Sequence, residues 1–194
     1  MKRIIPYLLG LAMVGLSASA TSAGEGRAEG SATAEVHALV TPNISVTPIQ
    51  PIVDAGSIQI GDLRATIYFQ VHANTEAVKF WVCATDLWKG TRADGATVPP
   101  IPLNSSAGAI IDPIGATVLG GGSNVAAFVR DSNIMGLPAK ETEQIAFESK
   151  DNGTFSHDVC VTVSWTLSNN EQPQGDYGGK VQLCAMVMPD GQRP

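Results

Sequence analysis

Apolar residues recur at every second position along most of this chain, and this spacing limits the fold more than any other feature. In the segment 64–71, Ala65, Ile67, Phe69 and Val71 alternate with more polar residues. Successive side chains of a β-strand point to opposite faces, whereas a helix repeats every 3.6 residues. The alternation therefore predicts strands that each have one buried face and one wetter face.

The same alternation recurs elsewhere in the chain. Four more long segments show it: 34–41, 77–85, 154–166 and 179–188. Shorter candidates are 44–47, 57–60, 115–119, 125–130 and 144–148. The 20 glycines and 12 prolines favour many turns between strands. About nine short strands without long helices predict an all-β fold, an antiparallel β-sandwich of immunoglobulin-like or pilin-like type.

Two regions fit this pattern poorly. The only helical candidate is 134–146, and Gly136 and Pro138 interrupt its first half, so one or two helical turns are expected at most. The stretch 86–124 shows no clear periodicity apart from its short candidate at 115–119. Neither region changes the expectation of a β-sandwich.

The N-terminus has the pattern of a secretory signal peptide. Met1-Lys2-Arg3 is basic, residues 4–16 are apolar, and residues 17–23 are small, with A-x-A-like cleavage options after Ala20 or Ala23. The apolar stretch is shorter than the roughly 20 residues of a membrane-spanning helix, so we expect cleavage rather than a retained anchor. The expected parts are a signal peptide (1–23), a flexible tail (24–33) and one β-sandwich domain (34–194).

Composition and motifs then narrow the function. With 12 basic and 18 acidic residues the net charge is −6, which disfavours a nucleic-acid surface. No G-x-S-x-G motif or haem-attachment motif is present. No histidine follows Cys184, so a blue-copper site lacks its ligands. We therefore expect an exported protein, periplasmic or extracellular, that is not an enzyme, holds no cofactor or metal and does not span the membrane once mature.

The three cysteines suggest one disulfide bond. If 154–166 and 179–188 form a hairpin centred near Gln172, matching their apolar faces sets Cys160 directly opposite Cys184. Directly opposed residues have Cβ atoms about 4.5–5.5 Å apart, close to what a disulfide needs. The expected bond is therefore Cys160–Cys184, with Cys83 left as a free thiol or paired between chains. Two free thiols beneath a loop are the alternative.

Both ends of the expected domain resemble known surface proteins. The segment 175–183 places G-x-Y before an alternating apolar strand, and Glu35 to Thr41 forms an alternating first strand. An exported sandwich with these ends resembles bacterial fimbrial subunits and secreted domains of the spore-coat-protein-U type. The resemblance implies a non-enzymatic building block or adhesive module of the cell surface, which associates with itself or with related subunits.

Two uses of such a domain remain open. In a structural subunit that assembles by strand addition, Val36, Ala38 and Val40 would be the apolar face of a strand, in its own sheet or donated to a neighbour. In a monomeric binding module, exposed aromatic side chains would form a platform that binds carbohydrate or a surface partner. The candidates for that platform are Tyr68, Trp81 and Trp88.

Overall fold

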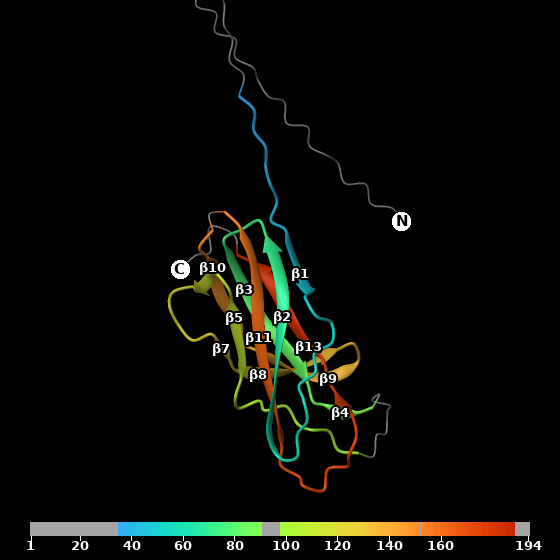
Figure 1. Cartoon of the computed structure of the whole chain (residues 1–194). Helices are drawn as coiled ribbons and strands as arrows, with labels where there is room; N and C mark the ends of the chain where they lie inside the picture. The colour runs from blue at the N-terminus through green and yellow to red at the C-terminus, as the bar shows by residue number, and fades with distance from the viewer. Residues whose placement is uncertain (1–34, 91–97, 152, 189–194) are drawn as a thin grey trace, which may run out of the picture. The chain divides into compact units, whose positions relative to one another are not determined.

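The structure, a computed structural model, describes residues 35–90, 98–151 and 153–188, and within these ranges every regular element is a β-strand (Figure 1). Residues Val40–Pro194 cluster as one unit and Met1–Leu39 as another. No helix in the described ranges is long and apolar enough to cross a membrane. The predicted all-β fold is confirmed.

One sheet contains five strands and is built around the longest pair. Strands β2 and β11 are antiparallel over thirteen residues each, from Phe155 opposite Ala73 to Leu167 opposite Gly61. Strand β1 forms one edge by pairing with β2. In order across the sheet, the strands are β1 (Ile44–Pro48), β2 (Gly61–Ala73), β11 (Phe155–Leu167), β5 (Ala109–Pro113) and β7 (Val125–Ala126).

The second sheet is organised around β3 (Ala77–Thr85), which has partners along both of its edges. One edge carries β13 (Val181–Val187). The other edge carries first β10 and then β9. The remaining path runs through β6 (Ala116–Val118), β10 (Ile145–Ser149), β9 (Leu137–Thr142) and β8 (Phe128–Ile134). A small separate ladder joins β4 (Trp88–Lys89) to β12 (Tyr177–Gly178).

The two sheets pack together through their inward-facing residues, in a sandwich-like arrangement. Phe80 of β3 lies 5.4 Å from Phe155 of β11 and 5.6 Å from Phe147 of β10, measured between ring centroids. All three rings are fully buried. Alternate residues of β2 from Leu63 to Ala73, and of β11 apart from His157, join the same core, as the alternation predicts. The core thus holds one face of each sheet.

Four of the five long segments expected as strands are strands in the structure. Segments 64–71, 77–85, 154–166 and 179–188 fall in β2, β3, β11 and β13. The fifth, 34–41, is wrong as a strand within the chain's own sheets, because its described residues from Glu35 onward form none and the first strand begins at Ile44. The short candidate 57–60 likewise forms no strand.

The helical candidate 134–146 is wrong, since this region forms β9 and β10. Met135 and Gly136 both have positive φ, 52° and 85°, and sit between the paired residues Ile134 and Leu137. Two residues of positive φ make the tight turn of a β-hairpin, whose twist suits the flanking strands. Gly136 therefore makes a hairpin turn between β8 and β9 rather than a weak point in a helix.

Candidate functional site

A large cavity in the described part of the molecule lies where the open edges of the two sheets meet. Strand β1 ends one sheet and β13 runs along the edge of β3 in the other, and the two strands lie beside each other (Figure 1). The cavity between them has a volume of about 970 Å³. We call it the edge groove, and its inner wall is formed by Leu63, Ala65, Ile67, Phe69, Trp165 and Leu183.

Two irregular segments frame the edge groove. After β1, residues 50–56 run along one side, and the Asp54 carboxylate accepts a hydrogen bond from the backbone N–H of Gly56 at 2.8 Å. On the other side, the Lys180 backbone N–H donates to the Thr85 hydroxyl oxygen at 2.9 Å, and the Thr85 N–H donates to the Lys180 carbonyl at 3.0 Å. Tyr177 is tied down through its hydroxyl, which donates to the Pro173 carbonyl at 2.7 Å. These bonds hold the rim in place.

The edge groove combines an apolar surface with two strand edges. Its lining is mostly aliphatic or aromatic, and Asp54 and Lys180 are its only charged members. Strand β1 has no partner beyond β2 among the described strands, and β13 none beyond β3. An exposed strand edge presents backbone N–H and C=O groups that another strand can pair with. The groove therefore offers both an apolar floor and a pairing edge.

The expected hairpin between the last two strands is wrong. Strand β11 pairs with β2 and β5, while β13 pairs with β3 in the other sheet. Cys160 accordingly lies opposite Tyr68 and Asp112, and Cys184 lies opposite Trp81. The segment that follows β11 crosses between sheets instead of turning back along the same one. All three cysteines are free thiols in this structure, so the Cys160–Cys184 pairing has no support from the strand order.

The structure brings a different pair of cysteines together. Cys83 of β3 and Cys184 of β13 belong to one small apolar cluster with Ile134 and Ala139. Burial raises the pKa of both thiols, and the neighbouring Cys83 helps to raise the pKa of Cys184 to about 11. Cys83, expected as a free thiol or as paired between chains, is a free thiol in this structure and lies near Cys184. The apolar alternation could not reveal this, because it carries no information on which strands are neighbours.

The segment 34–41, whose described residues form no strand, has its alternating apolar residues at Val36, Ala38 and Val40. Val36 is 90% exposed and Val40 is 78% exposed, and Ala38 is exposed as well. Ala34, the first apolar position of the predicted segment, lies outside the described residues. At this exposure the two valine side chains bury almost no apolar surface, so they add little hydrophobic stabilisation to the fold.

The structure does not bring the three aromatic candidates into one platform. Tyr68 is 44% exposed and lies on the outer face of β2, opposite to the inward-facing Ile67 and Phe69. Trp81 is half-buried and packs against the cysteine cluster on the outer face of the other sheet. Trp88 is half-buried in β4. Each side chain therefore belongs to a different surface.

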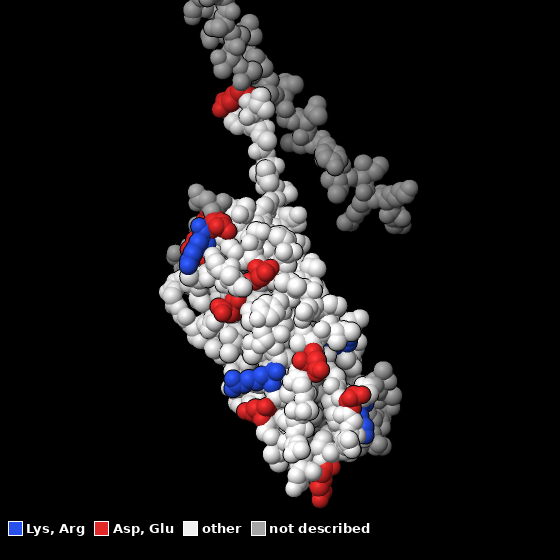
Figure 2. Space-filling view, viewed as in Figure 1, with Lys and Arg blue, Asp and Glu red and all other residues white. Residues whose placement is uncertain are grey.

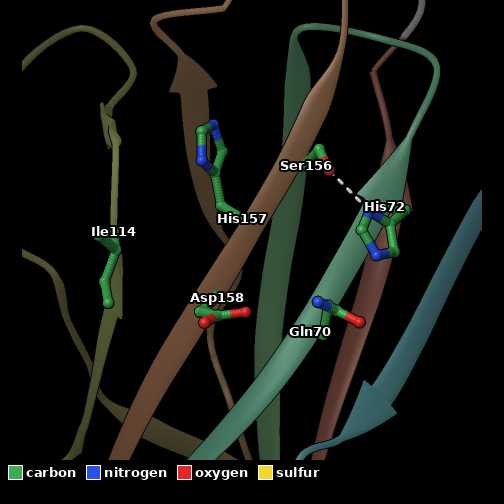
Figure 3. Close-up of a pocket in the computed structure, with 6 residues that line it drawn as sticks. All are labelled: Gln70, His72, Ile114, Ser156, His157 and Asp158. Atoms are coloured by element: carbon green, nitrogen blue, oxygen red, sulfur yellow. Dashed lines mark hydrogen bonds between the residues drawn. The ribbon is translucent and has the colours of Figure 1, made fainter.

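A shallow polar hollow lies on the outer face of β2 and β11, and it has the residue types of a catalytic site without the geometry (Figure 3). A Ser-His-Asp cluster lies beside this hollow: His157 Nε2 is 2.7 Å from the Oγ of the buried Ser149 and 3.6 Å from the Oδ2 of the exposed Asp151. A catalytic triad needs the acid on one ring nitrogen and the nucleophile on the other. Here both contact the same nitrogen, so this arrangement cannot activate the serine in that way.

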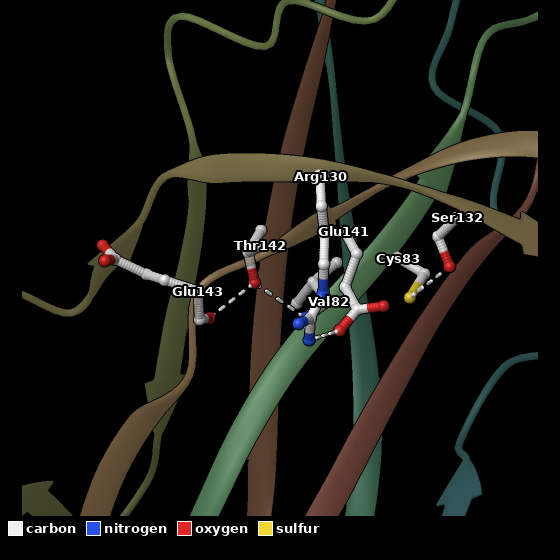
Figure 4. A network of polar contacts seen from close by, with 7 residues as sticks. All are labelled: Val82, Cys83, Arg130, Ser132, Glu141, Thr142 and Glu143. Carbon is white, nitrogen blue, oxygen red and sulfur yellow. Dashed lines mark hydrogen bonds and ion pairs between the residues drawn. The ribbon is translucent and has the colours of Figure 1, made fainter.

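Two further polar contacts join strands of the second sheet. Figure 4 shows Arg130 of β8 paired with Glu141 of β9, beside the contact between Cys83 Sγ and Ser132 Oγ at 3.8 Å. Charged side chains are scattered over the face seen in Figure 2, and neither sign forms a continuous patch there. Among the described residues no three metal-ligating side chains gather in one place.

The described part of the molecule thus combines an edge groove, an exposed alternating segment and two neighbouring free thiols. We compared the chain with protein-family models, with curated proteins and with solved structures. None of these comparisons finds a match.

Proposed function

We propose that this protein is an exported, non-enzymatic subunit of the bacterial cell surface that assembles by β-strand addition. Residues 34–41 of one copy lie in the edge groove of the next copy. The observation that carries this proposal is the apolar groove between two unpaired strand edges, in a chain whose own alternating segment is exposed and forms no strand. The secretory pattern of residues 1–23 supports export.

The spacing of the segment matches the spacing of the groove wall. Strand β2 presents an inward residue at every second position from Leu63 to Phe69 along the groove. The segment carries Val36, Ala38 and Val40 at the same period of two. A donated strand would place these side chains on the apolar floor and leave Glu35 and His37 toward water. Burying such aliphatic side chains stabilises the contact by about 25 cal/mol per Å².

Strand donation has a direction, and this direction sets the kind of assembly. Residues 34–41, which we call the donor segment, and the edge groove are different surfaces of the same chain. Each copy can therefore donate one strand and accept one. A contact of this kind is heterologous and extends into a fibre unless its geometry closes into a ring. A row of subunits is therefore the expected product.

The assembly is tested with substitutions on the two faces of the segment. The Val36→Asp, Val40→Asp double variant puts charge on the face that enters the groove, whereas His37→Asp puts charge on the opposite face and serves as the control. We expect filaments by electron microscopy for the unchanged protein and for His37→Asp, and dispersed monomers for the double variant. Dispersed monomers of the unchanged protein would contradict strand addition and favour the monomeric binding module.

A complementation experiment tests the groove itself. A chain that starts at Pro42 keeps every buried core residue but lacks the donor strand. A synthetic peptide of residues 34–42 should bind this shortened chain and raise its melting temperature, because a ligand of the native state stabilises it by mass action. The peptide with aspartate at positions 36 and 40 should not. Equal effects of both peptides would contradict specific binding in the groove.

A further inference from the structure

Cys83 and Cys184 occupy diagonal positions on two paired strands. In the antiparallel ladder between β3 and β13, Cys83 lies opposite Gln182 and Cys184 lies opposite Trp81. The two cysteines are therefore two positions apart across the ladder and point to the same face of the sheet. This face is outside the main core, and Ile134 of β8 and Ala139 of β9, two strands of the same sheet, belong to the same apolar cluster.

We propose that Cys83 and Cys184 are a redox pair that closes to a disulfide and ties the edge strand β13 to β3. Diagonal neighbours in a sheet have Cα atoms roughly 7–8 Å apart, slightly more than the distance a disulfide bridges without backbone movement. Among the described strands, β13 pairs with β3 alone, so it can shift toward β3 while the strands on the other edge of β3 stay in place.

The oxidant is a disulfide-bonded thiol compound, and the reaction proceeds by two exchanges. The half-buried Cys184, as its thiolate, attacks one sulfur of the oxidant, forms a mixed disulfide and releases the first thiolate. The Cys83 thiolate then attacks the Cys184 sulfur, forms the protein disulfide and releases the second thiolate. The two protons of the protein thiols end on the two released thiolates. The protein loses two electrons, which reduce the oxidant to two thiols.

The surroundings of the pair slow this reaction without preventing it. Cys83 is 5% exposed and its sulfur lies 3.8 Å from Ser132 Oγ. Burial raises the pKa of Cys83, while the hydrogen bonds from Ser132 and Cys184 and the charge of Arg130 lower it. Burial, Cys83 and the charge of Glu141 raise the pKa of Cys184 to about 11. Because the thiolate is the reactive form, the dithiol persists near neutral pH until a suitable oxidant reaches it.

A Cys83–Cys184 disulfide would also restrict the movement of one wall of the edge groove. Val181 and Leu183 of β13 line the groove, and Cys184 follows directly in the same strand. Alternate residues of a strand point to opposite faces, so a bond at Cys184 fixes the backbone that presents Leu183 to the groove. The redox inference itself stands on the β3–β13 register and holds whether or not the chain forms filaments.

Peptide mapping tests the pair on the whole, unsubstituted protein. After incubation with oxidised glutathione, remaining thiols are alkylated under denaturing conditions and the chain is cut with trypsin. Cleavage after lysine separates the cysteines into three peptides: 80–89, 151–180 and 181–194. We expect peptide 80–89 linked to peptide 181–194, and Cys160 alkylated. Before alkylation, the intact mass of the oxidised protein should be about 2 Da below that of the reduced protein, because two hydrogens are lost on oxidation.

The control is Cys160→Ser, which should form the same link to the same extent. Three outcomes would overturn the proposal: alkylation of both Cys83 and Cys184, a link that includes Cys160, or glutathione retained on Cys184 because Cys83 does not displace it. None of these readouts depends on filament formation, so failure here is distinguishable from failure of strand addition.

Discussion

The indole Nε1–H of Trp165 in β11 donates a hydrogen bond to the backbone carbonyl of Thr85, at the end of β3, over 2.8 Å. The two residues belong to different sheets. Thr85 also exchanges hydrogen bonds with Lys180, immediately before β13. A single buried residue thus joins one sheet to the rim of the edge groove, and Trp165 itself forms part of the groove wall.

Trp165→Phe should lower the free energy of unfolding. The substitution removes the donor of the inter-sheet bond, leaves the Thr85 carbonyl short of one partner and opens a small void. The loss of a buried hydrogen bond alone costs about 1–3 kcal/mol. Urea unfolding followed by circular dichroism measures the loss. Trp81→Phe, at a half-buried position, is the control and should cost less; an equal cost at both positions would contradict a special role for the Trp165–Thr85 bond.

Local alternation predicts where strands lie in this chain, and it predicts much less about which strands pair. Segments 154–166 and 179–188 each carry a run of apolar residues at every second position. That pattern fits a hairpin between them as well as it fits two facing sheets, because both arrangements bury the same side chains. The choice is made by thirteen residues of pairing between β11 and β2, far apart in sequence. Pairing at such a separation leaves no local signal.

The edge groove could not be predicted from the sequence either. Its wall comes from β2, β11, β13 and the segment after β1, which are scattered along the chain. The stretch 86–124, which shows little periodicity, contains β4, β5 and β6, and these strands are two to five residues long. Strands this short give too few alternations to detect. The alternation in residues 34–41, by contrast, can be read directly from the sequence, although the described residues of this segment form no strand.

Thr142→Val should destabilise the sheet at the point where β10 gives way to β9 along β3. Strand β10 pairs with β3 as far as Phe80, and β9 pairs with it from Cys83 onward. Between them, the Thr142 hydroxyl oxygen accepts a hydrogen bond from the Val82 N–H at 3.0 Å. Valine has nearly the same shape but leaves this buried N–H unpaired, at a cost of about 1–3 kcal/mol.

The control for this position is Thr142→Ser, which keeps the hydroxyl group. Thermal unfolding of the three proteins side by side measures the effect. We expect a clear fall in melting temperature for valine and a small one for serine. A valine variant as stable as the unchanged protein would show that the hydroxyl does not satisfy Val82.

Adjacent glycines at the groove rim give a matched pair of substitutions. A Cβ at Gly179 would lie 2.8 Å from Leu87 Cδ2 and 2.9 Å from both the Asp86 carbonyl oxygen and the Thr85 hydroxyl oxygen. A Cβ at Gly178 would meet nothing within 4 Å. Gly179→Ala should therefore displace the segment before β13, at a typical overpacking cost of about 1–3 kcal/mol, while Gly178→Ala should be nearly neutral.

The two alanine variants also test the groove, since Gly179 lines it beside Leu87. We expect Gly179→Ala to bind the peptide of residues 34–42 more weakly than Gly178→Ala does, as measured by calorimetry on chains that start at Pro42. Equal peptide affinities together with equal melting temperatures would contradict the close packing at Gly179.

The buried thiols should make stability fall at alkaline pH. The pKa of Cys184 is about 11 in the folded protein, compared with its ordinary value of 9.0. Between these values the unfolded chain releases the thiol proton while the folded chain retains it, so the unfolded state binds fewer protons and the free energy of unfolding decreases as pH rises. Below pH 9 both states hold the proton, and the effect disappears.

Unfolding under reducing conditions from pH 8 to 11 measures how steeply the free energy of unfolding falls with pH. Cys184→Ala should make the slope shallower, because only the contributions of the other buried thiols remain. Met186→Ala, a truncation on the same strand without a titrating group, should leave the slope unchanged. Equal slopes for Cys184→Ala and the unchanged protein would show that the thiol is not protected in the fold.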